Sequence, residues 1–426
     1  KGKIQTPTTK TINKSLSVVF PCKGKYDEKT QYPIWDKYLV QKYDGPIDFI
    51  FAAESEEDEA YIDIFNYLIS KKIENPTQFY NLSDNRRVIL KVTGLSYHCS
   101  QKIHNMLQGF RGQETEYFIT MDDDMLIHEF VFQELIHAID NKRAIGTGYT
   151  VEVPLSSSMT SQMVASYRSL LLYGFINEKC GGVWGGCMCL KRQDFIDLDV
   201  ENVWTNGGYS DDGLLQALAA KHNFELIAPE TIMFVNRVGE GKFSWKYIDY
   251  VLRQYFVLKY YLDARNRLLT TIQRWALILV GLLIQVSFVV FIYDQVVCYQ
   301  LNNILEGVLK LVGFLIYLFL IGQFQNVEIQ AFQNLSERLT GDHMEAKMNF
   351  LLSTISFHAH IMLGAYLLLY TLCIKQIRWA GVTYTCRKGK VVEVQRNGVC
   401  EKTVVQSQND YFNEKTPLCS NHQAIE

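Results

Sequence analysis

The chain has 426 residues, a formal net charge of −3 and an aromatic content of 13%. This length allows a large hydrophobic core and two structural parts. Because there is no global basic excess, the composition excludes nucleic acid as the expected partner. The high share of aromatic residues favours a part that lies in a membrane, where such rings collect at the lipid–water boundary. The sequence begins at Lys1, so we expect that an N-terminal anchor could precede it.

Short β-branched and aromatic runs alternate with helical stretches from residue 15 to about residue 235. The run IDFIFAA ends before Glu54 and YFITM ends before Asp122, whereas residues 58–72 have helical spacing. This alternation predicts an α/β domain with a mainly parallel sheet. Ligands bind at the carboxyl ends of the strands in such sheets, so functional side chains are expected directly after the strands.

Three stretches without charged residues follow in the second half of the chain, at 276–293, 311–326 and 349–374. Crossing a bilayer takes about 20 apolar residues, so we predict a membrane domain with about three spans. One of the stretches could instead be re-entrant or interfacial. The resulting division is a catalytic α/β domain at 1–245, an interfacial amphipathic segment at 246–275, the membrane domain at 276–374 and a tail with a small β-hairpin at 375–426.

The side of the membrane on which each part lies follows from charge. Arg265, Arg267 and Arg274 precede the first span, so the positive-inside rule predicts that the α/β domain faces the cytosol. The tail is basic, which favours the cytosol, but three spans would put it in the lumen, where Cys386 and Cys400 could form a disulfide. We leave its side open at this stage. The cysteines of the polar first part have no C-x-x-C pair and are expected to be free thiols.

Three adjacent carboxylates, Asp122, Asp123 and Asp124, close an apolar strand. They repel one another unless a cation lies among them, and a divalent ion bound to oxygen relieves that repulsion. Because strand side chains alternate, Asp122 and Asp124 can share a face and hold Mg²⁺ or Mn²⁺ next to a nucleotide diphosphate. The alternative is a solvated acidic turn, which the hydrophobic strand before it makes less favoured.

A second acidic pair, Asp211 and Asp212, follows two glycines and Ser210 and opens a helix. These residues could simply cap the helix. Transfer of a sugar to an alcohol needs a carboxylate near the attacking hydroxyl, so a general base is the functional interpretation.

Two further segments offer binding groups. Trp184, Gly185 and Gly186 combine a flat apolar ring with room for a ligand, although ordinary strand packing would explain them equally well. Lys102 lies near an expected helix start, where it could meet a phosphate.

Six segments in this order closely resemble ceramide glucosyltransferase, most nearly its plant-type branch, from about Ser17 to Val394 with an interruption in the membrane region. The segments are AESEEDEAY from Ala53, CSQKIHN from Cys99, MDDDM from Met121, VWGGCMCL from Val183, NGGYSDDGLLQALA from Asn206 and IRWAGVTYTCRKGKVVEV from Ile377.

The resemblance implies an inverting glycosyltransferase of the GT-A fold that uses UDP-glucose as donor and ceramide as acceptor, in the Golgi or endoplasmic reticulum membrane. It implies a role for Glu54 near the nucleotide base and for Lys102 near the donor diphosphate. It further implies that Asp122 and Asp124 bind the metal and that Asp212 is the general base.

The sequence differs from related membrane glycosyltransferases at one motif. Related membrane glycosyltransferases carry a (Q/R)-x-x-R-W motif, but Thr271 occupies its first position here, so we interpret Arg274 and Trp275 as an interfacial anchor. Arg253 and Gln254 match the plant-type counterpart, which lacks the Trp, and are expected at the diphosphate or the acceptor.

Three alternatives stay open. A processive polysaccharide synthase would share the acidic motifs but is expected to carry the full motif and more spans. A glycosyltransferase could act on another lipid, such as a sterol or a polyprenol phosphate. A scaffold that only binds a nucleotide sugar would release no UDP.

Overall fold

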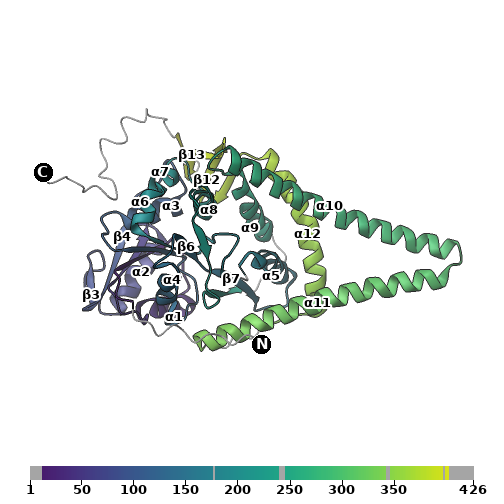
Figure 1. The fold of residues 1–426 in the computed structure, drawn as a ribbon, viewed down its shortest axis with the longest axis horizontal. Coiled ribbons are helices and arrows are strands. Elements are labelled where there is room, and N and C mark those ends of the chain that lie inside the picture. The colour runs from purple at the N-terminus through teal and green to yellow at the C-terminus, as the bar shows by residue number, and fades with distance from the viewer. Residues whose placement is uncertain (1–11, 176–177, 239–244, 342–345, 397–398, 403–426) are drawn as a thin grey trace.

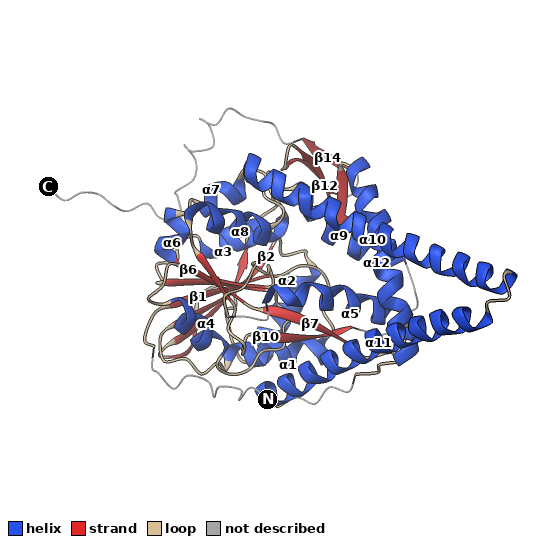
Figure 2. Ribbon diagram, turned by 45° about the vertical axis from the view of Figure 1, so that its right-hand side comes forward, coloured by secondary structure: helices blue, strands red, loops and turns tan. Residues whose placement is uncertain are grey.

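The computed structural model describes residues 12–175, 178–238, 245–341, 346–396 and 399–402. An eight-stranded sheet lies at the centre of the first part, in the order β3-β4-β2-β1-β5-β8-β6-β9 (Figures 1 and 2). Neighbours β4, β2, β1 and β5 run parallel, whereas β3 and β8 run antiparallel to their neighbours. The strands are β1 (Leu16–Pro21), β2 (Ile47–Ala53), β3 (Tyr80–Ser83), β4 (Arg86–Val92), β5 (Tyr117–Met121), β6 (Ala144–Thr147), β8 (Cys187–Lys191) and β9 (Glu225–Ile227).

Helices cover both faces of this sheet, because β1, β2 and β5 are buried along nearly their whole length and need apolar partners on each side. One core contains Trp35 of α1 and Ile64 of α2, and the other contains Ile103 of α3 and Leu215 of α8. The expected mainly parallel α/β architecture is confirmed. Its helices are α1 (Glu28–Leu39), α2 (Glu59–Ser70), α3 (Gln101–Phe110), α4 (Val131–Ile139), α6 (Arg192–Asp197), α7 (Val200–Thr205) and α8 (Asp211–His222).

Gly109 lets α3 approach the sheet closely. A Cβ at this position would lie 2.5 and 2.8 Å from the two methyl carbons of Val19 on β1. Overpacking costs about 1–3 kcal/mol, which exceeds the helix propensity of about 1 kcal/mol that alanine gains over glycine. We therefore expect Gly109→Ala to lower the melting temperature of the purified protein. Gly313→Ala is the matched control, because no atom lies within 4 Å of a Cβ there; an unchanged melting temperature in Gly109→Ala would contradict the packing account.

A smaller two-stranded parallel sheet extends the α/β domain toward the C-terminal helices. It pairs β7 (Tyr149–Pro154) with β10 (Met233–Val238), and α5 (Met159–Leu172) packs against it. A short 3₁₀ helix, η1 (Tyr173–Phe175), follows α5. After the α/β domain come α9 (Trp245–Phe256) and a second 3₁₀ helix, η2 (Val257–Lys259).

Within the described residues, three helices are long and apolar enough to cross a membrane: α10 (Ala264–Gln300), α11 (Ile304–Thr340) and α12 (Phe350–Cys373). The prediction of a C-terminal region with membrane-length helices is confirmed. The first two helices have 37 residues each and are much longer than the uncharged stretches that predicted them. A bilayer core needs only about 20 residues, so both helices continue beyond it into polar sequence.

The tail forms a four-stranded antiparallel sheet rather than a single hairpin, with β11 (Gln376–Trp379), β12 (Val382–Arg387), β13 (Lys390–Arg396) and β14 (Val399–Lys402). The eight cysteines whose side chains are described are free thiols, Cys386 included. The prediction of a Cys386–Cys400 pair is therefore wrong for this structure, because Cys386 is a free thiol; the side chains of Cys400 and Cys419 lie outside the described residues.

Candidate functional site

The sequence-predicted residues converge at the carboxyl edge of the central sheet. Glu54 directly follows β2, and Asp122 directly follows β5. Lys102 lies in the first turn of α3, whose N-terminus is capped by the hydroxyl of Ser100. Asp211 is the first residue of α8. Four elements from different parts of the chain therefore bring charged side chains to one edge.

Lys102 joins the two acidic motifs. Its Nζ lies 2.8 Å from Oδ1 of Asp122 and 3.1 Å from Oδ2 of Asp211, and it donates a hydrogen bond of 3.0 Å to the carbonyl oxygen of Gly185. Burial alone would lower the pKa of Lys102, but the charges of both aspartates outweigh it and raise that pKa. The amine is therefore held as a cation between two carboxylates.

Asp211 and Asp212 have different surroundings although they are neighbours. Asp211 is buried, and desolvation raises its pKa to about 6 even though Lys102 opposes the shift. Asp212 is only partly buried. Its Oδ1 accepts hydrogen bonds from Oγ of Ser210 at 2.8 Å and from the backbone N–H of Gly213 at 2.7 Å. Its Oδ2 accepts only a longer bond of 3.3 Å, from the N–H of Gly185. Oδ2 of Asp212 is thus oriented by the backbone and keeps capacity to accept a proton.

The segment of Trp184, Gly185 and Gly186 connects both acidic motifs through its backbone. The carbonyl oxygen of Gly186 accepts a bond of 2.9 Å from the N–H of Asp122. A Cβ at Gly185 would lie 3.0 Å from a carboxylate oxygen of Asp211, so this position has no room for a side chain. Trp184 is 8% exposed and packs against Tyr149 and Phe234, so most of its ring belongs to the core rather than to a ligand surface.

The three adjacent aspartates point to different partners. Asp122 pairs with Lys102, as described above. Asp123 accepts a short hydrogen bond from the hydroxyl of Tyr26, and desolvation raises its pKa to about 6. Asp124 keeps a solvent-accessible surface, but desolvation by the surrounding protein raises its pKa to about 8, with the charges of Asp123 and Asp122 adding to the shift. The three carboxylates therefore do not favour being charged together unless a cation lies beside them.

The backbone of the acidic loop is fixed by α1. The carbonyl oxygen of Asp123 accepts from Nε1 of Trp35 at 3.1 Å and from the side-chain amide of Gln31. The hydroxyl of Tyr38 donates to the carbonyl oxygen of Asp122 at 3.1 Å. Three side chains from one helix thus preorganise the loop.

No group of three or more His, Cys, Asp or Glu residues that could hold a metal ion is present in the described part of the chain. The donors nonetheless suit Mg²⁺ or Mn²⁺, because such ions are commonly bound by one or two carboxylates, with phosphate oxygens and water supplying the other ligands. Desolvation and the charges of Asp123 and Asp122 disfavour the charged form of Asp124, and a bound cation would favour it again. Asp122 and Asp124 are the residues that would hold it.

Glu54 forms an ion pair with Lys23, which follows β1, and Lys23 also lies 3.0 Å from a carboxylate oxygen of Asp58. The second oxygen of Glu54, Oε2, is buried and has no hydrogen-bond partner among the described residues. Since a buried unpaired oxygen is costly, this oxygen is suited to accept a bond from a ligand.

Arg253 and Gln254 lie on α9, apart from the ion pairs around Lys102. The guanidinium of Arg253 is held over the rings of Tyr250 and Trp379, with its Cζ 5.9 and 5.6 Å from their centroids. Burial raises the pKa of Tyr209, two residues before Asp211, and Arg253 lies close enough to oppose that rise. Gln254 is half-buried. Their expected role at the diphosphate or acceptor stays a prediction. Arg274 donates to the carbonyl oxygen of Leu258 at 2.6 Å, and Trp275 is half exposed, as an interfacial anchor would be.

Sequence reasoning missed a buried acid on the second sheet. Glu152 of β7 lies with its carboxylate 3.3 Å from Nε of Arg168 on α5, and desolvation raises its pKa. The charge of Glu152 also contributes to the raised pKa of Asp124. The signal was available in the sequence, because Glu152 is the one charged residue in the apolar run YTVEVP.

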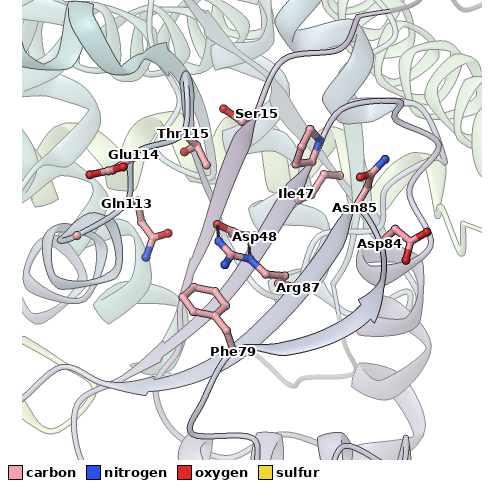
Figure 3. Close-up of a pocket in the computed structure, with 12 residues that line it drawn as sticks. Ser15, Ile47, Asp48, Phe79, Asp84, Asn85, Arg87, Gln113, Glu114 and Thr115 are labelled. Atoms are coloured by element: carbon pink, nitrogen blue, oxygen red, sulfur yellow. Dashed lines mark hydrogen bonds and ion pairs between the residues drawn. The ribbon is translucent and has the colours of Figure 1, made fainter.

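A separate pocket of about 460 Å³ lies at the opposite edge of the sheet, where the strands begin (Figure 3). It is lined by Phe79 and by the ion pair between Asp48 and Arg87, among other residues. None of the sequence-predicted site residues lines it.

No protein-family model and no curated protein matches this chain. Among solved structures, it is similar to a mannosyltransferase from Pyrobaculum calidifontis in complex with GDP-Man and Mn²⁺. The two chains are 12% identical, with a TM-score of 0.36, over 60% of this chain and 65% of that chain. This chain therefore spans less than two thirds of the length of that structure, and we assign no activity to it from this likeness.

Proposed function

We propose that this chain is a membrane-bound glycosyltransferase of the GT-A fold that transfers glucose from UDP-glucose to the primary hydroxyl of ceramide with inversion. The observation that supports the proposal most is the bridge that Lys102 makes between Asp122 and Asp211. It brings Lys102, the cation proposed for the diphosphate, next to Asp211, the neighbour of the proposed base Asp212, at one edge of the sheet. The choice of glucose and ceramide rests on the resemblance of the six sequence segments.

The donor would bind along the strand ends. Glu54 has a free carboxylate oxygen for the nucleoside, and Lys102 is a cation within reach of a diphosphate. When the donor enters, Lys102 can exchange one of its aspartate partners for a phosphate oxygen. A side chain at Gly185 would crowd the carboxylate of Asp211, so the glycine lets Asp211 stay beside Lys102.

The reaction is a single displacement. Asp212 accepts the proton of the acceptor hydroxyl, and the oxygen attacks the anomeric carbon from the face opposite the diphosphate. A new carbon–oxygen bond forms as the bond to the β-phosphate oxygen breaks, and UDP leaves with that electron pair. Lys102 offsets the charge that develops on the leaving diphosphate.

Metal dependence is an expected result. When bound, Mg²⁺ or Mn²⁺ would neutralise diphosphate charge that the aspartates cannot. We expect excess EDTA to abolish transfer and added Mg²⁺ or Mn²⁺ to restore it, measured as UDP release from the purified protein. A full rate in EDTA, from a preparation shown to contain no metal, would exclude this role for Asp122 and Asp124.

A lipid acceptor requires a catalytic site beside a membrane. Three apolar helices follow the α/β domain, and α12 contacts α5 and α9 of the site-bearing part. A ceramide headgroup could reach the site from the bilayer surface while its chains stay in lipid. We propose the Golgi or endoplasmic reticulum membrane, with the α/β domain facing the cytosol.

The deciding experiment supplies membranes that contain the chain with UDP-glucose or UDP-galactose and ceramide, followed by lipid mass spectrometry. We expect hexosylceramide from UDP-glucose only, and none from membranes that contain an Asp212→Asn variant. Parallel reactions test the other acceptors. Formation of a sugar polymer, of a glycosylated sterol or of a glycosylated polyprenol phosphate, without hexosylceramide, would show that ceramide is not the acceptor. Failure to release UDP with any acceptor would favour a binding scaffold.

A further inference from the structure

Helix α12 lies across the base of the hairpin that α10 and α11 form, rather than alongside the two helices. Figure 1 shows α10 and α11 diverging from their shared tip, with α12 running from one to the other part-way along their length as the third side of a triangle. The contacts agree with this view. A Cβ on Gly281 of α10 would meet Ala365 in the second half of α12, and one on Gly322 of α11 would meet Phe350 and Thr354 in its first half.

The inner face of α12 packs on the α/β domain and α9 along most of its length. Oγ of Ser356 donates to the carbonyl oxygen of Met159 on α5 at 3.4 Å. Nδ1 of His360 lies 2.5 Å from the hydroxyl of Tyr247 on α9. Of the 18 most apolar consecutive residues of α12, 44% are buried, compared with 11% in α10 and none in α11.

The helices under α12 carry charges that do not fit the middle of a bilayer. Asp249 and Arg253 lie on α9, and Asp249 is exposed, whereas Arg168 of α5 is paired with Glu152 inside the protein. A charged side chain at the bilayer centre costs at least about 2.5 kcal/mol, and α12 cannot cross without taking these neighbours with it. The packing of α12 therefore places it at the membrane surface.

The tail sheet that follows α12 is docked on the α/β domain. The hydroxyl of Tyr384 accepts a bond of 3.1 Å from the N–H of Gln101 at the start of α3. Arg396 donates to the carbonyl oxygen of Ser96 at 2.8 Å, and the N–H of Val391 donates to Gly207 at 2.9 Å. These contacts require the tail and the α/β domain to lie on the same side of the membrane. Three crossings between them would separate the two, so the number of crossings is even.

We propose that α10 and α11 form the only membrane-crossing hairpin among the described helices, and that α12 lies in the bilayer surface with its outer face in contact with lipid. The hairpin beyond α12 has the required length. At about 1.5 Å per residue, Gly281 to Gln300 spans about 29 Å and Ile304 to Gly322 about 27 Å, against about 30 Å for a bilayer core. The turns nearest the tip carry Lys310, which is ion-paired with Asp294 and Glu306, so these charges lie toward the far surface of the bilayer.

The outer face of α12 fits contact with a lipid surface. Its exposed large side chains are apolar or aromatic, and two of them are tyrosines near its end, a residue type that collects at the lipid–water boundary. They are Phe350, Leu351, Ile355, Tyr366, Tyr370 and Leu372. This face continues the exposed apolar surface of α10 and α11, so one bilayer can cover all three helices.

The test inserts a specific protease site into the full chain at one of three positions and treats sealed vesicles with the protease. The positions are after Lys402 in the tail, between Asn302 and Asn303 at the hairpin tip, and between Asp84 and Asn85 in the exposed β3–β4 turn. We expect the fraction of chains cut at the tail site to lie within about twofold of the fraction cut at the β3–β4 site. The tip site should be cut only after detergent is added.

Protection of the tail site in sealed vesicles that leave the β3–β4 site open would overturn the proposal. Cleavage at the tip in the same vesicles would also overturn it. A second measurement needs no insertion: an impermeant amine reagent should label the exposed Lys388 and Lys390 of the tail and Lys25 of the α/β domain alike, but not Lys310 near the tip. Neither result depends on sugar transfer, so failure of the proposed activity would leave this topology standing.

Discussion

Replacement of Asp212 by asparagine is expected to lower the rate of transfer by about 10²–10⁴, the usual effect of losing a general base. The amide has the shape of the carboxylate and can keep its Oδ1 contacts to Ser210 and Gly213, so the fold should not change. It cannot accept the acceptor's proton. The affinity for UDP should change little, because Asp212 forms no ion pair with Lys102, the residue proposed to hold the diphosphate. Turnover and UDP affinity, measured on the same purified variant, separate these effects.

Two controls sharpen this result. Asp197→Asn removes a surface carboxylate that only accepts from Gln193, and it should leave both quantities unchanged. Asp211→Asn removes a partner of Lys102, and it should weaken donor binding as well as turnover. Near-normal turnover in Asp212→Asn with a large loss in Asp211→Asn would move the role of base to Asp211.

Much of the α/β domain could be predicted because its signals are local. The runs before Glu54 and Asp122 are strands, and the residues expected after them lie at the carboxyl edge. Lys102 lies beside Asp122, so two residues singled out in the sequence meet, whereas the role of Lys102 at a diphosphate stays a prediction. Strand periodicity and the edge rule for parallel sheets were sufficient for these inferences.

The contacts that could not be predicted join distant parts of the chain. The pairing of Glu152 with Arg168 requires the second sheet to pack on α5, and nothing within either segment specifies that. The tail sheet is a similar case, because Tyr384 meets Gln101 across 283 positions of sequence. Hydropathy likewise counts apolar residues but not what they touch, so it could not distinguish α12, which packs on the protein, from α10 and α11.

Replacement of Lys102 by methionine is the second change with a large expected effect. It removes the charge that Asp122 and Asp211 share while keeping a side chain of similar length. We expect turnover to fall by about 10²–10³, as when one electrostatic group is removed from an active site. Donor affinity should fall with it, because the diphosphate loses its cation. Lys91→Met is the matched control, since Lys91 donates only to a backbone carbonyl, that of Arg111.

A structural role for Lys102 would also predict lost activity, because the single variant leaves the buried Asp211 without its partner, and an unpaired buried charge destabilises a fold. The double variant Lys102→Met with Asp211→Asn separates the two accounts. Removing the carboxylate charge should restore much of the melting temperature but not donor binding or turnover. Recovery of transfer in the double variant would show that Lys102 serves only to neutralise Asp211. Donor affinity that is lower in the double variant than in Asp211→Asn alone, in a protein with restored stability, would place the lysine at the diphosphate, because only that role needs the cation itself.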